Sequence, residues 1–340
     1  MNHNPLQLAT RAHELALRQY GPEHPSTLLV ARNLALVYRL QARYTEAQPI
    51  AEQTLQIQER VLGLEHPDTL KSLDNLASLL AVKGDPIAAE PIYRRALEAR
   101  ERVLGPEHPD TLNSLNNLAL LLARKGDNPA AEPLYRRALE VRERVLGPEH
   151  PDTLSVLNNL ANLLSHKADL PAAEALHRRV LEVQERVLGQ DHPNTPKFLD
   201  NLALVLVRQG DLTTAESLHR RALEIGQRVL GPDHPDTLKT MSCLASLLAA
   251  KGDLVAAEQL YRSAIQGMVR VLGPEHPDIL PSLNDLSTLL ANKGDLAGAL
   301  PLLERVLQGM LKFMGPDDTN AEAFVKHLAS VREAMAKIGC

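Results

Sequence analysis

Aromatic residues, cysteines and long apolar runs are all scarce in this sequence. It has no tryptophan and three phenylalanines among 340 residues, so a core has to be built from leucine, alanine, valine and isoleucine. No apolar run reaches the roughly 18 residues of a transmembrane helix, and the first residues lack the apolar segment of a signal peptide. Two cysteines, Cys243 and Cys340, cannot form a disulfide framework and favour a reducing compartment. A cytoplasmic protein without a membrane span is therefore expected.

The balance of charge excludes further classes of protein. Hydrophobic residues make up 44% and charged residues 23% of the chain, as in globular proteins, which excludes a disordered or collagen-like chain. The net charge of −5 comes from 37 basic and 42 acidic residues, and it offers no broad attraction to nucleic acid or to anionic membranes. No nucleotide-binding, zinc-protease or serine-hydrolase motif occurs. We therefore expect a protein that is not an enzyme and that needs no cofactor or metal.

A repeat of 42 residues runs through the chain without insertion or deletion. Glycine marks each step, within the string GPEHPDT or one close to it, and the block VLGPEHPDTL at 103–112 recurs unchanged at 145–154. A period of this length indicates a stack of small supersecondary units. The marking glycines are Gly21, Gly63, Gly105, Gly147, Gly189, Gly231, Gly273 and Gly315.

Each unit contains two amphipathic helices, which we call A and B. In the third unit the apolar residues of 111–126 recur at i, i+3, i+4 and i+7, the stripe of an amphipathic helix A. Helix B is predicted over 128–146, and Lys125, Gly126 and Asp127 form the turn between the two helices, with aspartate capping helix B. Neither helix can bury its stripe alone, so consecutive pairs must stack. The stripe residues of this unit are Leu115, Leu118, Ala119 and Leu122 in helix A and Ala131, Tyr135 and Ala138 in helix B.

The predicted fold is therefore all-α, an α-solenoid of stacked antiparallel helix pairs. Residues 1–20 align with helix B and are predicted to form a half repeat at the N-terminal end. Seven helix pairs are predicted over 21–315. Residues 316–340 are predicted to form a polar C-terminal capping helix.

The spacing of these stripe residues resembles the tetratricopeptide repeat. The 42-residue period and the strings HPDTLNSLNNLALLL and AAEPLYRRALEVRERVLG are similar to the kinesin light chain type of that repeat, and the resemblance covers nearly the whole chain. It implies a right-handed superhelix in which the A helices line a concave groove that binds peptides. A protein-interaction scaffold is therefore the leading interpretation of the function.

An asparagine recurs on the face of helix A that lies opposite the apolar stripe. A carboxamide offers both a donor and an acceptor to a peptide backbone. Neighbouring helices pack about 8–10 Å apart, so successive asparagines should span about three residues of extended chain. Basic residues flank them, which favours an acidic peptide or a C-terminal carboxylate. The candidate groove residues are Asn33, Asn75, Asn117, Asn159, Asn162, Asn201, Lys71, Arg124, Lys197, Arg208 and Lys239.

Other interpretations of the same face and of the chain stay open. The asparagines can instead form contacts between repeats. Apolar side chains of a ligand can be accepted by the apolar residues of the same face, Leu29, Leu36, Leu40 and Val82, although packing is favoured for the leucines. The chain can also be a structural array that associates end to end as a homo-oligomer, or the regulatory module of a larger effector protein.

Three recurrent patterns of charged or titratable residues are interpreted as structural features rather than as functional sites. Loops about 10 Å apart cannot share a metal whose ligands lie about 2 Å away, so the histidine that recurs in each loop is expected to cap a helix. His177 and His219 replace Tyr135 and are expected to pack in the core. The arginine pairs of helix B, with Glu98–Arg102 and its equivalents at i and i+4, predict a solvent face of ion pairs rather than a nucleic-acid site. The loop histidines are His24, His66, His108, His150, His192, His234 and His276.

Glycines interrupt helix B in the last three units, at Gly226, Gly267 and Gly309. Each costs up to about 1 kcal/mol relative to alanine in a helix. We predict that the C-terminal third of the chain exchanges its amide hydrogens faster than units two to four. Hydrogen exchange followed by mass spectrometry measures this, and equal protection throughout would contradict it.

Overall fold

The computed structural model describes residues 5–314 and, beyond them, Val325, Leu328, Ala329 and Arg332. All regular structure in this part of the chain is helical. Most of the capping helix predicted for 316–340 therefore lies outside the described residues, as do residues 1–4 of the predicted half repeat. The chain divides into two compact units, residues 1–159 and residues 160–340.

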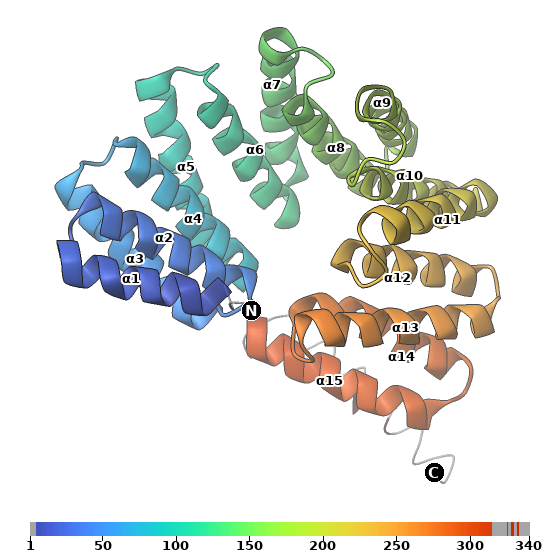
Figure 1. Cartoon of the computed structure of the whole chain (residues 1–340). Coiled ribbons are helices and arrows are strands. Elements are labelled where there is room, and N and C mark those ends of the chain that lie inside the picture. Colours follow the sequence, from blue (N-terminus) through green and yellow to red (C-terminus); the bar gives the residue numbers. More distant parts are fainter. Residues whose placement is uncertain (1–4, 315–324, 326–327, 330–331, 333–340) are drawn as a thin grey trace. The chain divides into compact units, whose positions relative to one another are not determined.

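The first unit is a succession of helices, and each of the first six packs against the next one along the chain (Figure 1). The first helix is of the B type, and A and B helices alternate after it. The last A helix, α8 (Pro151–His166), begins in this unit and ends in the second. The other helices are α1 (Pro5–Tyr20), α2 (Pro25–Leu40), α3 (Tyr44–Val61), α4 (Pro67–Lys83), α5 (Pro86–Leu104), α6 (Pro109–Arg124) and α7 (Asn128–Leu146).

The second unit continues the same alternation of antiparallel neighbours. A short 3-10 helix, η1 (Pro277–Ile279), precedes its last A helix. The helices are α9 (Leu170–Leu188), α10 (Thr195–Gln209), α11 (Leu212–Val229), α12 (Pro235–Ala250), α13 (Leu254–Leu272), α14 (Leu280–Asn292) and α15 (Leu296–Met314).

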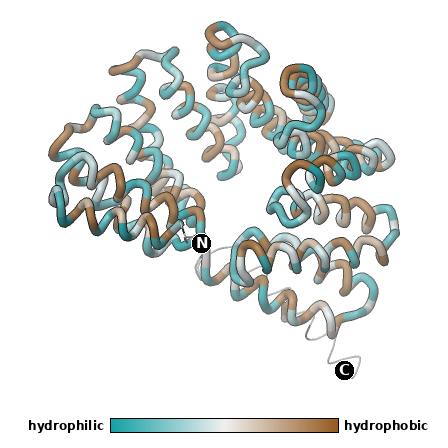
Figure 2. The backbone as a smooth tube through the Cα atoms, viewed as in Figure 1, coloured by the Kyte–Doolittle hydropathy of each residue, from teal (hydrophilic) through white to brown (hydrophobic). Residues whose placement is uncertain are grey.

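The core consists of the predicted apolar stripes. Every stripe residue of the third repeat is buried, and Ala131, Tyr135 and Leu115 have almost no exposed surface. Apolar and polar residues alternate along the helices, as the hydropathy colouring shows (Figure 2). Burying one leucine side chain contributes roughly 1.5–3 kcal/mol, so the stripes stabilise the stack although aromatic residues are scarce.

Five of the seven loop histidines cap an A helix, as predicted. The Nδ1 atom of His66 accepts a hydrogen bond of 3.2 Å from the backbone N–H of Asp68. This bond satisfies one of the free N–H groups at the start of the helix. It requires a neutral imidazole with an unprotonated Nδ1. The same bond caps an A helix at His24, His108, His150 and His234. His276 caps the short helix η1 instead, and His192 accepts from the N–H of Asn194, which precedes α10.

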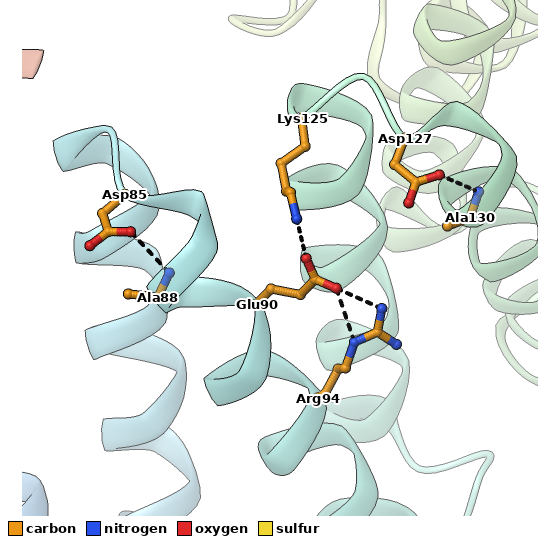
Figure 3. Close-up of polar contacts among 7 residues, drawn as sticks. All are labelled: Asp85, Ala88, Glu90, Arg94, Lys125, Asp127 and Ala130. Atoms are coloured by element: carbon orange, nitrogen blue, oxygen red, sulfur yellow. Dashed lines mark hydrogen bonds and ion pairs between the residues drawn. The ribbon is translucent and has the colours of Figure 1, made fainter. Parts of the chain in front are cut away.

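The lysine–glycine–aspartate triplets form the turns between A and B helices, also as predicted (Figure 3). Asp127 accepts a hydrogen bond of 3.2 Å from the N–H of Ala130 at the start of α7. Lys125 forms an ion pair with Glu90 of the preceding repeat, and Arg94 binds the same carboxylate at 2.7 Å. These two cations hold the pKa of Glu90 below its usual range. The triplet therefore joins neighbouring repeats and is not a ligand sequence.

Helix B contains ion pairs at i and i+4, as between Glu90 and Arg94, but the predicted pair of Glu98 and Arg102 is not one of them. Arg102 pairs with Glu65 at 2.5 Å, rather than with Glu98. Glu65 lies in the loop before helix A of the same repeat, and the antiparallel arrangement brings this loop to the end of helix B. Arg60 and Arg144 bind the corresponding loop glutamates in the same way. The predicted solvent face of ion pairs is present, and the arginines near the end of helix B connect it to the loop before helix A.

Two of the glycines in helix B make room for a neighbouring leucine. A methyl group on Gly267 would lie 2.5 Å from Cδ2 of Leu238 in α12, and one on Gly309 would lie 2.5 Å from Cδ2 of Leu280. The preceding repeat has the reverse combination, with Ile225 in helix B and Pro196 in helix A. Packing therefore offsets part of the helix-propensity cost on which the hydrogen-exchange prediction was based.

Two alanines occupy a backbone conformation that the other repeats give to glycine. Ala168 has φ +65° and Ala42 has φ +56°, whereas the equivalent Gly126 has φ +82°. A left-handed conformation costs an L-residue about 1–2 kcal/mol, which exceeds the extra chain entropy that glycine loses on folding.

We predict that Ala168→Gly raises the free energy of unfolding by about 0.5 kcal/mol. Thermal and urea unfolding of the full chain measure this change. Gly126→Ala is the matched control and should destabilise the protein by a similar amount. A lower melting temperature for Ala168→Gly would contradict the prediction.

Candidate functional site

The recurrent asparagines lie on successive A helices, one on each of α2, α4, α6, α8 and α10. Asn33 is exposed, and Asn75, Asn117, Asn159 and Asn201 are half-buried. The Nδ2 group of Asn159 donates a hydrogen bond of 3.0 Å to Oδ1 of Asn116 in the preceding repeat. At this position the carboxamide therefore makes the contact between repeats that was considered as the alternative to ligand binding.

A cleft of about 310 Å³ lies between α4 and α6 in the first unit, with α5 behind it. It brings two of the recurrent asparagines, Asn75 and Asn117, together with Arg124 at the end of α6. Val82 and Leu120 add apolar surface to its walls. The cleft thus combines two carboxamides, one cation and an apolar lining within the reach of a short peptide segment.

Tyr93 of α5 lies behind the cleft. Its ring is buried, and burial raises the pKa of its hydroxyl to about 12. A hydrogen bond with Ser78 of α4 opposes this shift, because it lowers the pKa of the hydroxyl. The phenol is therefore neutral at physiological pH and is held against α4, where it shapes the cleft without adding charge.

A buried ion pair neutralises the acidic residue nearest to the cleft. Asp74 Oδ2 lies 2.6 Å from Nη1 of Arg100, whose side chain is only 4% exposed. Arg100 also donates a hydrogen bond to Ser114. Burial raises the pKa of Asp74, and the guanidinium opposes that shift. No ion pair among the described residues involves Arg124, which therefore carries the net charge of the cleft.

Sequence reasoning did not identify Arg100. Its signal was an arginine on the buried stripe of helix B. The repeat before it has Gln58 at this position, and the second repeat after it has Gln184. Arg142 repeats the feature one unit later and binds the backbone carbonyl of Asp152 at 2.7 Å. A buried arginine needs such partners because an unpaired charge in the interior is costly.

The remaining candidate residues are not part of this cleft. Arg208 donates hydrogen bonds to the carbonyl and hydroxyl of Ser165, which ties α10 to the end of α8. Lys239 forms an ion pair of 3.1 Å with Asp278. Partners within the chain thus hold two of the predicted basic residues. The others occupy separate places on the A helices: Lys71 and Lys197 are exposed, and Asn162 is half-buried.

The asparagine positions of the last two repeats hold Cys243 and Asp285. Burial raises the pKa of the Cys243 thiol to about 12, and the carboxylates of Asp200 and Asp285 add to this shift. The thiol therefore stays protonated and is a poor nucleophile. Among the described residues, no group of three or more histidine, cysteine, aspartate or glutamate side chains could hold a metal ion.

Two histidines replace the buried tyrosine of helix B, and both are buried as predicted. His219 Nδ1 lies 2.8 Å from Oδ1 of Asp200. The other carboxylate oxygen of Asp200, Oδ2, accepts a hydrogen bond of 2.5 Å from the hydroxyl of Thr240. The two ring nitrogens of His177 are buried and have no hydrogen-bond partner among the described residues. Burial lowers the pKa of His177 to about 4.

We predict that acid destabilises the protein through His177. Its pKa is about 6.5 when the chain is unfolded and about 4 when it is folded, so the unfolded state binds the proton more tightly. The stability that folding gains by keeping His177 neutral is fully present above pH 6.5, and it is lost as the pH falls towards 4. The full loss is about 3 kcal/mol, because a tenfold change in proton affinity is worth about 1.4 kcal/mol.

Melting temperatures at pH 7.5 and pH 5 test this effect. The His177→Tyr variant, which carries the residue found at position 135, should lose less stability between these two values than the wild type. Substitution of the exposed His166 by glutamine is the control and should leave the pH dependence unchanged. An equal acid response of His177→Tyr and wild type would refute the assignment.

The comparisons with known proteins agree with the repeat architecture. A sequence model described as tetratricopeptide repeat matches residues 6–60, 30–82, 68–144, 115–186, 194–268 and 236–312. No curated protein matches the chain. In the part of the chain that the structure describes, none of the helices is both long and apolar enough to cross a membrane.

Solved structures provide three points of comparison. A putative kinesin light chain from Podosopora anserina with nearly identical TPR-like repeats is 26% identical, with a TM-score of 0.53, over 60% of this chain and 97% of its own. BtubC (BKLC) from P. vanneervenii is 25% identical, with a TM-score of 0.52, over 69% of this chain and 92% of its own. Yeast Tom70 covers 97% of this chain and 59% of its own at 13% identity, with a TM-score of 0.61, and this likeness concerns the fold alone.

Proposed function

Because the chain belongs to the tetratricopeptide repeat family, we propose that it is a non-enzymatic scaffold that binds an extended peptide of a partner protein along the exposed face of its A helices. Repeats of this family form protein-interaction scaffolds. The observation that carries the proposal is the cleft between α4 and α6, where the side chains suited to a peptide meet.

The carboxamides of Asn75 and Asn117 supply the contacts that do not depend on the peptide sequence. Each can donate to a backbone carbonyl and accept from a backbone N–H. They stand on successive A helices, so they engage peptide groups that lie a few residues apart. Extended backbone would otherwise lose its hydrogen bonds to water on entering the cleft, and these side chains replace them.

Arg124, Val82 and Leu120 supply the preference for particular peptides. Arg124 favours an acidic side chain or a C-terminal carboxylate, because a guanidinium binds a carboxylate through two parallel hydrogen bonds. Val82 and Leu120 favour an apolar side chain next to that group. The buried pair of Asp74 and Arg100 leaves this preference intact, since its two charges offset each other.

Peptides selected from a random library on the purified chain test the proposal, with fluorescence anisotropy to measure their affinities. The double variant Asn75→Ala/Asn117→Ala should weaken all selected peptides about tenfold or more, because each lost hydrogen bond costs about 1 kcal/mol. Arg124→Ala should weaken acidic peptides and leave neutral ones nearly unchanged.

Two variants outside the cleft serve as controls. Asn128→Ala removes a carboxamide at the start of α7, and Arg136→Ala removes an exposed arginine that pairs with Glu132. Selected peptides that bind the double variant as tightly as the wild type would exclude the cleft as the binding site. The cytoplasmic location predicted from the sequence stays a prediction.

A further inference from the structure

A second cleft lies in the first unit, where the beginnings of α2 and α4 meet the end of α3. Its volume is about 210 Å³, several times the roughly 30 Å³ that one water molecule occupies in the liquid. Leu28, Leu29 and Leu62 give it an apolar lining. Leu29 belongs to the exposed face of α2 and is itself 46% exposed, so the cleft adjoins the face on which we place the peptide. We call it the Gln58 cleft, after a polar residue of its lining.

Gln58 contributes a buried carboxamide to this cleft. The residue is only 2% exposed, and its carbonyl oxygen Oε1 is buried without a hydrogen-bond partner among the described residues. A buried acceptor that has lost its water and has no donor is costly. A ligand that donates a hydrogen bond to this oxygen removes the cost, so the cleft favours a ligand group that carries an N–H or O–H.

The same position of helix B is polar and paired in the three repeats that follow. Arg100 and Arg142 bind the partners described above. Nε2 of Gln184 lies 3.0 Å from Nδ1 of His192. The unpaired oxygen of Gln58 is therefore a property of this one cleft and not of the repeat.

An arginine on helix A explains why Gln58 lacks a partner. Asp74, which pairs with Arg100 in the second repeat, is replaced by Arg32 in the first. Nη1 of Arg32 lies 3.3 Å from Oδ1 of Asp68 in α4, and both residues line the cleft. Because these two charges offset each other, the lining carries no net charge. A neutral ligand group therefore suits the cleft better than a carboxylate or an amine.

We infer that the Gln58 cleft binds the side chain of a glutamine or asparagine of the partner peptide. A carboxamide carries an N–H that donates to Oε1 of Gln58 and a carbonyl oxygen that accepts from Nε2, so the two groups pair through two parallel hydrogen bonds. It is neutral, and its methylene stem contacts the leucines of the lining. The inference rests on the proposed function in one respect, since the carboxamide belongs to the peptide that binds along the A helices.

An NMR titration of the full chain with labelled glutamine side chains tests the inference. The probe is N-acetyl-L-glutamine N-methylamide, which places the side chain between two peptide groups. It should shift the amide signal of Gln58, which is identified by its loss in Gln58→Met. N-acetyl-L-methionine N-methylamide, a probe of similar length without the carboxamide, should bind at least tenfold more weakly because it leaves Gln58 unpaired.

Variants of Gln58 and of its counterpart separate pairing from mere occupation of the cleft. Gln58→Met should weaken the glutamine probe at least tenfold, followed by the backbone signal of Leu29, and should leave the methionine probe nearly unchanged. The variant should fold, because Met268 occupies the same position of a later repeat and is 1% exposed. Gln184→Met is the matched control and should bind both probes like the wild type.

Equal affinity of the wild type for the two probes would overturn the inference, as would binding of the glutamine probe that survives Gln58→Met. The double variant Asn75→Ala/Asn117→Ala should still bind the glutamine probe, because those residues lie outside the Gln58 cleft. If the probe leaves Gln58 unshifted while selected peptides depend on Asn75 and Asn117, the inference fails and the proposed function stands. The opposite pair of results would support the Gln58 cleft and exclude the cleft between α4 and α6.

Discussion

The short connection between each A helix and its B helix is the constraint on which the other contacts depend. Two or three residues bring the first turn of B beside the last turn of A, and only a small side chain fits there. Alanine, without exposed surface, meets this need in every complete repeat. Because the two axes approach closely, the longer stripe residues, such as Leu115 and Tyr135, interdigitate and exclude water. An insertion would move one stripe relative to the other, which accounts for the unbroken period.

The features that could be predicted from the sequence are those set by local spacing and repeated in each unit. The stripe at i, i+3, i+4 and i+7, the histidine and aspartate caps and the glycine turns all depend on residues within one helical turn or one loop. Each was seen several times in the sequence, so a chance pattern could be excluded. The fold followed from these features, and the resemblance to the tetratricopeptide repeat added the arrangement of the pairs.

The contacts that could not be predicted connect residues that lie far apart in the sequence. Arg102 had an acidic residue four positions away, and the helical rule chose Glu98. The antiparallel arrangement of helices A and B instead places Glu65 2.5 Å from the guanidinium. The buried Arg100 is a similar case, because its partner Asp74 lies on the A helix beside it and becomes a neighbour only in the folded chain. Charge on the exposed face of the A helices therefore could not be summed from the sequence, since Lys239 and Arg208 already have partners.

The recurrent asparagine can make both kinds of contact that its spacing allows, contacts between repeats and contacts with a peptide. A carboxamide has two donor hydrogens and two acceptor lone pairs, so the bond between Asn159 and Asn116 uses only part of its capacity. A contact between repeats fixes the direction of the side chain and lowers the entropy that a ligand would otherwise have to remove. Structural contacts at some positions of the series and peptide contacts at others are therefore compatible. The cleft at Asn75 and Asn117 is the place where the surrounding residues favour the second role, because an unpaired cation and an apolar wall stand beside the carboxamides there.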